Sequence, residues 1–518
     1  MKRFLEKELW LYDRKIRVSY SSKIEISHSN YPAKNGHIKT SFKIYTFQKV
    51  PSKIMKKDVS ISPTNNFYRW FNRDFWRAFS NKRLPIEIPK TKKDKDKLIK
   101  KVCSLVLSGR YAANIPETEL INNKGYGVAR TIPVFCMEDY CVYYFCIKEL
   151  EDVLCVDRTP NTFGGWSLGG KFRQKEKNEI EIECENTDYG RYSFNPQAWT
   201  QAFGEFNSLL FSQLDQGLYS HVLQFDLSNF YDSVRLDALE RWIREESDSE
   251  KGWIITLLFY FLNHWNRRNT GLHPQTVGLP QDALADCSRI LANYYLQKYD
   301  KFTAGVCEKV EALYFRYADD QMILLNCPDK IDGLLLLLTR QLDRYGLRVN
   351  QKKVHIWETE ELKKHRCRDI QAIFSQQNDN KDEILVRQFV DAYLKIPEND
   401  LNKTWNSGTP LLNRLLWAKL ESLPSDLFEI IAIRLTSEKF ICMSDHKKLK
   451  RIHELNDKRA QPINFSTHLK QLGEKSVHNA YHHEALAFAI LTKNHNLQMY
   501  LETRLNSLKQ QMDTHEIC

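Results

Sequence analysis

The 518-residue sequence contains no long hydrophobic run. Its longest aliphatic stretch, the leucines at 334–338, is far shorter than the roughly 20 apolar residues with which a helix spans a bilayer. The opening residues MKRFLEKELW include no apolar core segment, so we expect no secretory signal peptide. These absences predict a cytoplasmic protein that has no membrane partner.

Motifs for structural zinc and for a phosphate-binding loop are also missing. The 12 cysteines are scattered, and Cys136, Cys141 and Cys146 stand five residues apart, which is not a zinc-ligand spacing. We interpret the cysteines as reduced thiols. The glycine-rich stretch GGWSLGGK at 164–171 lacks the Gly-Lys-Ser/Thr ending of a Walker loop, so it predicts no P-loop nucleotide site.

Positive charge is present in excess. The chain has 76 Lys and Arg residues against 65 Asp and Glu residues, a formal net charge of +11. This excess favours a polyanionic partner, although a merely soluble basic protein explains the charge equally well. With 42% hydrophobic residues, the chain is long enough for about two to four globular domains.

Aromatic and basic residues are concentrated near the N-terminus. The segment FYRWFNRDFWRAF at 67–79 has aromatic residues three to five positions apart, which predicts an amphipathic helix. Its aromatic side chains belong either to a core or to a surface that stacks on bases. The run KTKKDKDKLIKK at 90–101 is a solvated segment, and we interpret it as a linker or a phosphate-contacting face.

Hydrophobic periodicity predicts an α+β fold. The residues indicate strands within 111–160 (ARTIPVF and YCVYYFCI), a loop and hairpin at 161–195, and a helix at 196–216. The segment 221–234 is expected to form an apolar strand that ends on an acid. It is followed by a helix at 281–300, a hairpin at 311–325, a helix ended by Gly346 and a strand at 347–357. This order predicts an antiparallel sheet with helices on one face. Later helices are expected at 383–395, 411–421, 425–436, 443–456 and 478–506.

Three acidic residues stand where apolar strands end. Asp226 ends the apolar strand of the segment 221–234, and Asp319 and Asp320 lie at the tip of the hairpin YFRYADDQMILL (314–325). If these strands are neighbours in one sheet, the three carboxylates converge. Such a cluster is stable around hard divalent cations such as Mg²⁺, and two ions about 4 Å apart can promote phosphoryl transfer.

Five motifs in order give the chain a resemblance to reverse transcriptases. YADD (317–320) looks like their palm hairpin, and FDLSNFYDSV (225–234) looks like the first acidic motif of the palm. GLPQDALADCSRILANYYL (278–296), GLRVNQKKVHI (346–356) and NKGYGVARTIPVF (123–135) are similar to three further family segments. The resemblance covers roughly 110–400 and implies a right-hand polymerase with fingers, palm and thumb, and helical additions at both ends.

The resemblance implies a role for several residues. Asp226 and Asp319 would be the principal ligands of two Mg²⁺ ions, and Asp320 would support the site. Tyr231 matches the bulky residue that closes on the sugar and excludes a 2′-hydroxyl; a core tyrosine is the alternative.

Four more positions match nucleotide-contacting residues of the family. Gln281 would lie beside the sugar and base of the nucleotide. Lys353 would protonate the departing pyrophosphate, with Lys352 as its rival. Arg130 and Lys124 would neutralise the triphosphate.

The chain departs from the family pattern at two positions. Asp282 stands where the family has a glycine, and Arg289 replaces a usual proline, while Ser288 is kept. We expect Asp282 either to cap the helix that follows or to project its charge to where template or nucleotide would lie. The second interpretation makes template-independent or repetitive DNA synthesis an alternative to ordinary copying.

The family layout divides the chain into a basic aromatic N-terminal region (1–110), fingers (111–220), palm (221–357), thumb (358–400) and a helical C-terminal domain (401–518). This layout resembles bacterial defence-associated reverse transcriptases, which implies an antiphage role, a non-coding RNA as template, dNTPs as substrates and DNA as product. The sequence does not decide between a monomer and a homo-oligomer. The alternative from another class is an RNA-binding scaffold with a silent polymerase site.

A histidine-rich segment near the C-terminus, HNAYHHEA (478–485), has no place in these motifs. His478 and His482 stand four apart, as two metal ligands on one helix face would. The H-E-x-x-H pattern is missing, so we favour a structural or RNA-facing role for these residues.

Overall fold

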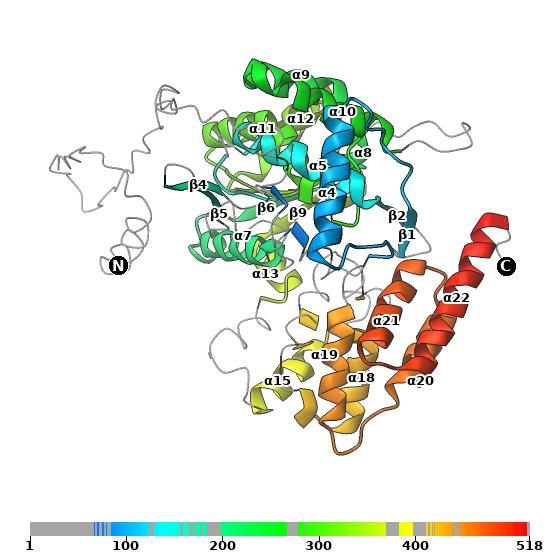
Figure 1. Cartoon of the computed structure of the whole chain (residues 1–518). Coiled ribbons are helices and arrows are strands. Elements are labelled where there is room, and N and C mark those ends of the chain that lie inside the picture. The colour runs from blue at the N-terminus through cyan, green and yellow to red at the C-terminus, as the bar shows by residue number, and fades with distance from the viewer. Residues whose placement is uncertain are drawn as a thin grey trace, which may run out of the picture. The chain divides into compact units, whose positions relative to one another are not determined.

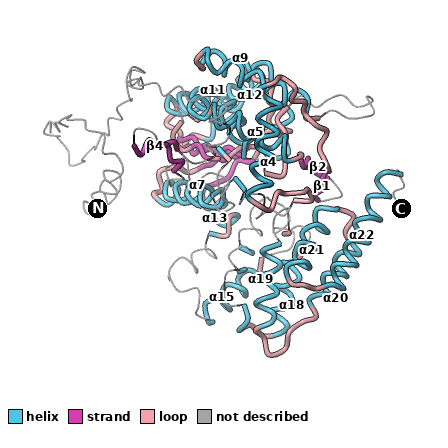
Figure 2. Tube along the Cα trace, viewed as in Figure 1, coloured by secondary structure: helices cyan, strands magenta, loops and turns pink. Residues whose placement is uncertain are grey.

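The computed structural model divides the chain into two units, Met1–Ser60 and Ile61–Cys518, and all described residues belong to the second. They are residues 67, 70–71, 75–76, 79, 84–123, 129–155, 159–164, 168, 171–176, 179–183, 198–266, 278–284, 286–368, 383–396, 411–412, 415–416, 418, 420–437, 440–441 and 446–514. Figure 1 and Figure 2 show the arrangement of their helices and strands.

The central element is a five-stranded sheet with the order β3-β7-β8-β6-β9. All neighbouring strands are antiparallel except β3 and β7, which are parallel. The sheet therefore places β6 and β8, the two strands that carry the predicted acids, side by side. The bounds of the five strands are Thr162–Phe163 (β3), His221–Phe225 (β6), Leu313–Tyr317 (β7), Asp320–Leu325 (β8) and His355–Glu358 (β9).

Alternating side chains make both faces of this sheet apolar. One face carries Leu223, Phe225, Ile323 and Leu325, and the other carries Val222, Phe315, Met322 and Leu324. The first face packs into the core that includes α5 (Met137–Glu149), α10 (Gly252–His264), α11 (Asp286–Lys309) and α12 (Ile331–Arg344). The second packs against α7 (Ala198–Asp215) and α13 (Thr359–His365). The α+β class is confirmed, but the prediction of helices on one face is wrong because the sheet is buried on both sides.

The segment YCVYYFCI is helical and lies within α5, so its prediction as a strand is wrong. Every residue from Tyr140 to Ile147 is buried. A helix that is apolar all round has no polar face to mark its period, and β-branched and aromatic residues then imitate a buried strand. The other predicted strand of this region is confirmed as β2 (Ala129–Val134), which pairs with β1 (Thr118–Asn123) in an antiparallel hairpin.

The aromatic side chains near the N-terminus are part of the core. Phe67, Trp70, Phe71, Phe75, Trp76 and Phe79 are all buried. Phe67 packs on Phe145 and Phe75 on Tyr144 of α5. The stacking-surface alternative is therefore wrong for these rings. The lysine run after them is not a linker, because it forms the first turns of α4 (Lys92–Leu107), with Thr91 as its N-cap.

Several helices and turns complete this part of the chain. The predicted hairpin after 161 is confirmed as β4 (Lys171–Glu176) and β5 (Glu179–Glu183). The helix predicted from 281 begins at Asp286, and the strand predicted near 347 begins at His355, after a 3-10 turn at Gln351–Lys353. Three further helices are α6 (Glu151–Leu154), α8 (Phe230–Ser233) and α9 (Leu236–Glu246).

The C-terminal region is helical, as its periodicity predicts. Its helices are α15 (Glu383–Leu394), α18 (Ser425–Leu435), α19 (His446–Asp457), α20 (Phe465–Lys475), α21 (Asn479–Leu491) and α22 (His495–Thr514). They share a second hydrophobic core, separate from that of the sheet. The segment 478–506, expected as one helix, is divided between α21 and α22.

Among the described residues, no helix is both long enough and apolar enough to cross a membrane.

Candidate active site

The first acid of the site follows a buried strand. Asp226 comes directly after β6, and only 6% of its surface is exposed. The segment 348–350 runs beside it: the Asn350 N–H donates to the Asp226 carbonyl at 2.8 Å, and the Ser228 N–H donates to the Arg348 carbonyl at 2.8 Å. These bonds place the next turn, Gln351–Lys353, at the end of β6.

The second and third acids lie in a tight hairpin between β7 and β8. Tyr317 pairs with Asp320, so Ala318 and Asp319 form its tip. Ala318 has a φ of +53°, a left-handed conformation that is strained for a residue with a side chain. Its N–H donates to the Phe163 carbonyl at 3.1 Å. The strained tip is therefore held by a hydrogen bond to β3, the strand that pairs with β7.

The sheet brings the three acids together. The register that pairs Phe225 with Gln321 continues one step to place Asp226 opposite Asp320. Burial and the Asp226 carboxylate raise the pKa of Asp319, and burial together with Asp319 and Asp226 raises the pKa of Asp320. These shifts have the sign expected for like charges that are close together and poorly solvated.

Two basic side chains offset this negative charge. The ammonium of Lys353 donates to Oδ2 of Asp226 at 2.6 Å, and half of its side chain is exposed. Arg366 is buried, and the Asp320 carboxylate acts on it; burial lowers the pKa of this guanidinium to about 10. Sequence reasoning proposed Lys353 but missed Arg366, which lies at the end of α13 outside any motif.

A buried polar network lies beneath the hairpin. Arg316 is fully buried and donates to both carboxylate oxygens of Asp300, at 2.8 and 2.7 Å. Its Nη1 also donates to Oδ1 of Asn293 at 2.8 Å and to the Ala318 carbonyl at 2.7 Å. The hydroxyl of Tyr314 donates to Asp300 at 2.9 Å. One guanidinium thus connects α11 to the strained tip that carries Asp319.

Tyr231 lies beside the acids. It is partly buried, and burial raises its pKa to about 12, while Arg289, Asp319 and Arg130 are the charged groups that act on its phenol. Its carbonyl accepts the Leu279 N–H at 2.9 Å. The structure therefore brings the exposed Arg130 of β2 and the residue in the place of the usual proline, Arg289, to the same tyrosine.

Gly278 explains how this approach is made. A Cβ atom on Gly278 would lie 2.4 Å from the Tyr231 carbonyl oxygen and 2.6 Å from Cα of Asp232. Real atoms do not approach so closely, so only glycine fits here. The half-buried Gln281 follows in the same loop, and the Ala283 N–H joins that loop to β2 through the Pro133 carbonyl at 3.2 Å.

Comparison with known families decides the class of the site. Residues 179–378 match the family described as reverse transcriptase (RNA-dependent DNA polymerase). This segment is similar to a reverse transcriptase domain. The match includes Asp226, Tyr231, Asp319, Asp320 and Lys353. A search of the curated proteins found no match to the chain.

The domain identifies the chain as an RNA-directed DNA polymerase, a nucleotidyltransferase that uses an RNA template and dNTPs to make DNA. Reverse transcriptases generally use divalent metal ions. Within the described ranges, no group of three or more His, Cys, Asp or Glu side chains is placed to hold a metal by itself. Mg²⁺ is commonly bound by one or two carboxylates together with substrate phosphates and water. The interacting oxygens of Asp226 and Asp319 fit that mode of binding.

Asp282 is placed differently from both expectations for it. The helix of this reverse transcriptase segment starts at Asp286, and Oδ2 of Asp282 accepts the Leu284 N–H at 3.0 Å in the turn before it. Only 4% of Asp282 is exposed, and its charge acts on the buried Tyr140. The acid therefore stabilises a turn ahead of α11. Its burial removes the reason to expect a charge projecting toward the template.

Two other predictions concern Lys124 and the histidine-rich segment 478–485. Lys124 is outside the described residues. In the histidine-rich segment, the fully buried His482 bonds through Nε2 to the Ser476 carbonyl at 3.1 Å, and Glu484 accepts the His446 N–H at 2.8 Å. These contacts support the structural interpretation of that segment over a metal pair.

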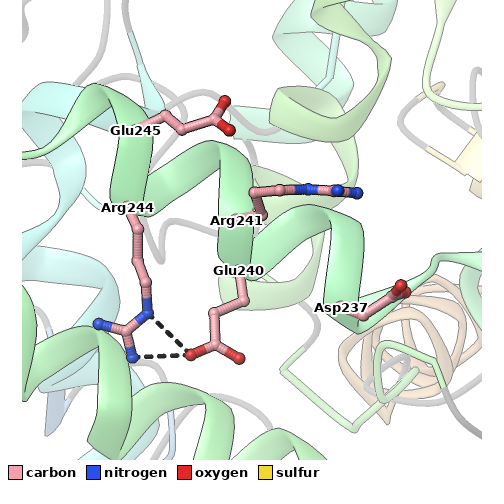
Figure 3. A pocket seen from close by; sticks show the side chains of 5 residues that line it. All are labelled: Asp237, Glu240, Arg241, Arg244 and Glu245. Atoms are coloured by element: carbon pink, nitrogen blue, oxygen red, sulfur yellow. Dashed lines mark hydrogen bonds and ion pairs between the residues drawn. The ribbon is translucent and has the colours of Figure 1, made fainter.

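A surface hollow of about 390 Å³ lies on α9, the helix that follows the motif with Asp226 and Tyr231. Figure 3 shows its charged side chains, and Arg244 donates to Oε1 of Glu240 through both Nε and Nη2, at 2.9 and 2.7 Å. It contains none of the predicted site residues, and its lining carries both signs of charge, so we assign it no ligand. The lining residues are Asp237, Glu240, Arg241, Arg244 and Glu245.

Proposed function

We propose that this polymerase works by two-metal phosphoryl transfer at Asp226, Asp319 and Asp320, with two Mg²⁺ ions as its cofactor. The observation that carries the proposal is the convergence of three acids in a buried site, where burial and the neighbouring carboxylates raise the pKa of Asp319 and of Asp320. Buried acids that repel one another are stabilised by a cation. Two such ions, when bound, activate the attacking 3′-hydroxyl and stabilise the leaving phosphate.

Lys353 acts on the leaving group in this proposal. Burial lowers its pKa and the bond to Asp226 raises it, with a net rise, so the ammonium carries its proton at neutral pH. A protonated amine beside the catalytic acids can neutralise the departing pyrophosphate and donate a proton to it. Lys352 is exposed on the same 3-10 turn and has no described bond to the acids. Lys353 is therefore the better of the two candidates.

The nucleotide would be selected and bound by Tyr231, Gln281, Arg130 and Lys124. The ring of Tyr231 would exclude a 2′-hydroxyl, and Arg130 would neutralise the triphosphate. The support for this assignment is the approach of Arg130 and Asp319 to Tyr231, because triphosphate and catalytic metal must be adjacent during transfer.

Primer extension by the purified full chain tests this function. We expect incorporation of dNTPs on an RNA template with added Mg²⁺, complete loss of incorporation in EDTA, and recovery when Mg²⁺ is restored. Binding of RNA without any incorporation, across a range of templates, primers and divalent ions, would instead support the scaffold with a silent site. Sequencing the product with and without added RNA separates copying from template-independent synthesis.

We also propose a role in bacterial antiphage defence, with a non-coding RNA as template. Its support is the resemblance of the chain's layout to defence-associated reverse transcriptases. We expect expression of the wild-type chain with its genomic flanking sequence to reduce phage plating at least tenfold relative to Asp319→Asn. Equal plating across a broad phage panel would contradict the role, and sequencing of copurified RNA would identify the template.

A further inference from the structure

One side chain joins the C-terminal helices to the hairpin that carries Arg130. The amide of Asn479, at the start of α21, makes two hydrogen bonds to the backbone of β1. The Ile121 N–H donates to its Oδ1 at 2.6 Å, and its Nδ2 donates to the Glu119 carbonyl at 2.9 Å. Only 8% of Asn479 is exposed. The two bonds use both functions of the amide, so the contact is specific for this side chain.

The contact occupies the outer edge of the hairpin. In the β1–β2 register, Glu119 is opposite Pro133, which has no N–H to donate, and Ile121 is opposite Thr131. Backbone groups of residues two apart in a strand point to the same side, so those of Glu119 and Ile121 face away from β2. Asn479 therefore takes the place of a missing third strand at this point.

The helix that carries Asn479 belongs to two cores. Ala480, next in the chain, is buried in the core of the polymerase sheet, whereas Tyr481, Ala485 and Phe488 are buried in the C-terminal core. The turn before α21 is held from the C-terminal side. The Ser476 carbonyl accepts from Arg504 at 3.3 Å and bonds to His482. These hydrogen bonds fix the backbone turn that precedes Asn479.

The other end of the hairpin reaches the active site. In β2, Ala129, Arg130 and Thr131 are exposed, while Ile132, Pro133 and Val134 are buried. Ile132 and Val134 anchor the base of the hairpin in the core, and Leu120 adds the matching contact from β1. Asn479 adds an attachment on β1, the strand in which Asn122 pairs with Arg130.

We propose that Asn479 is a positioning residue, through which the C-terminal helices hold the β1–β2 hairpin so that Arg130 meets the incoming nucleotide. The inference rests on the proposed function, because it takes Arg130 to bind the triphosphate. It assigns the C-terminal domain a part in nucleotide binding. A purely structural clamp would change stability without changing nucleotide affinity.

Two variants and a matched control test the inference in the full chain. Asn479→Ala removes both bonds, and Asn479→Asp keeps the acceptor for Ile121 but sets a carboxylate against the Glu119 carbonyl. Asn494→Ala is the control, because Asn494 also bonds through both amide atoms, to Ser466 and to the Leu497 N–H, but within the C-terminal helices. Its loss costs a similar pair of bonds without touching β1.

For Asn479→Ala we expect the KM for dNTPs to rise about five- to tenfold with kcat within about twofold, as for the loss of ground-state positioning. Amide hydrogen exchange of 118–123 should become faster. Asn479→Asp should show the same changes, and Asn494→Ala should show neither. A wild-type KM in both Asn479 variants, or equal changes in Asn494→Ala, would overturn the inference while the proposed function stands.

The two proposals fail in distinguishable ways. If the wild-type chain incorporates no dNTP under any condition, the proposed function fails and the nucleotide role of Asn479 fails with it. If wild-type incorporation is normal and exchange of 118–123 is unchanged in Asn479→Ala, only the inference about Asn479 fails.

Discussion

Arg316→Lys tests whether the buried network beneath the hairpin positions the catalytic Asp319. The guanidinium of Arg316 makes four hydrogen bonds: two to Asp300, one to Asn293 and one to the Ala318 carbonyl. A lysine ammonium keeps the charge but donates from one point, so it cannot reach both sides of this network. We expect about two of the four bonds to be lost.

The magnitude follows from the burial of the site. A hydrogen bond to a charged group contributes about 1.5–3 kcal/mol, and breaking a buried ion pair costs about 3–5 kcal/mol. Because Arg316→Lys keeps the charge, we expect a loss of about 3 kcal/mol in stability. Ala318 carries roughly 1–3 kcal/mol of backbone strain, which the lost bond helps to hold. If the tip relaxes and Asp319 is displaced, an increase of about 1.4 kcal/mol in the activation free energy would lower the rate of DNA synthesis tenfold.

Urea unfolding and primer extension measure the two effects. We expect a lower unfolding midpoint and DNA synthesis reduced about tenfold or more in Arg316→Lys. Arg344→Lys is the matched control, because Arg344 is exposed at the end of α12 and its side chain donates to Gln341 on the same helix. Arg316→Lys with wild-type rate and midpoint would refute the reasoning that the network holds the hairpin.

Three further substitutions test the site. Lys353→Ala should lower DNA synthesis about a hundredfold by loss of a general acid, whereas Lys352→Ala should stay near wild type; equal effects would contradict the assignment, and single-turnover kinetics measure both. Gly278→Ala should destabilise the chain by about 1–3 kcal/mol and slow synthesis, whereas Gly333→Ala, with open space around it, should do neither in thermal melts and extension assays. Tyr231→Ala should raise ribonucleotide incorporation relative to deoxynucleotide incorporation in competition assays, and unchanged selectivity would show that the tyrosine serves the core.

The acids and the strands that carry them could be predicted because local pattern and chemistry agree there. An apolar run that ends on an acid, as at Asp226, has few explanations other than a site, and the paired acids of the hairpin have the same character. The three carboxylates converge because β6 and β8 are antiparallel neighbours in the sheet. Lys353 could be proposed because its segment, GLRVNQKKVHI (346–356), resembles the lysine motif of reverse transcriptases.

Other features depend on contacts that no local pattern records. The apolar α5 has no polar face, so its period was hidden. Nothing in the local sequence distinguishes Arg316 from an ordinary strand residue, because its partners Asp300 and Asn293 lie on α11. Asn479 finds its partners in β1, about 360 residues earlier in the chain. Asp282 shows the reverse case, in which an unusual residue suggests a special function and its burial in a turn supplies a plainer reason.

The most direct test of the central claim compares Asp319→Asn with the exposed-acid control Asp329→Asn. Removing the Asp319 charge should lower Mg²⁺-dependent DNA synthesis by more than about a hundredfold. Burial and Asp226 raise the pKa of Asp319, so the charged acid opposes folding at neutral pH when no metal is bound. This cost is absent at low pH and grows as the pH rises toward the folded pKa. We therefore expect Asp319→Asn, in EDTA at neutral pH, to be inactive but to melt at no lower temperature than the wild type. DNA synthesis near the wild-type rate in Asp319→Asn would contradict the account.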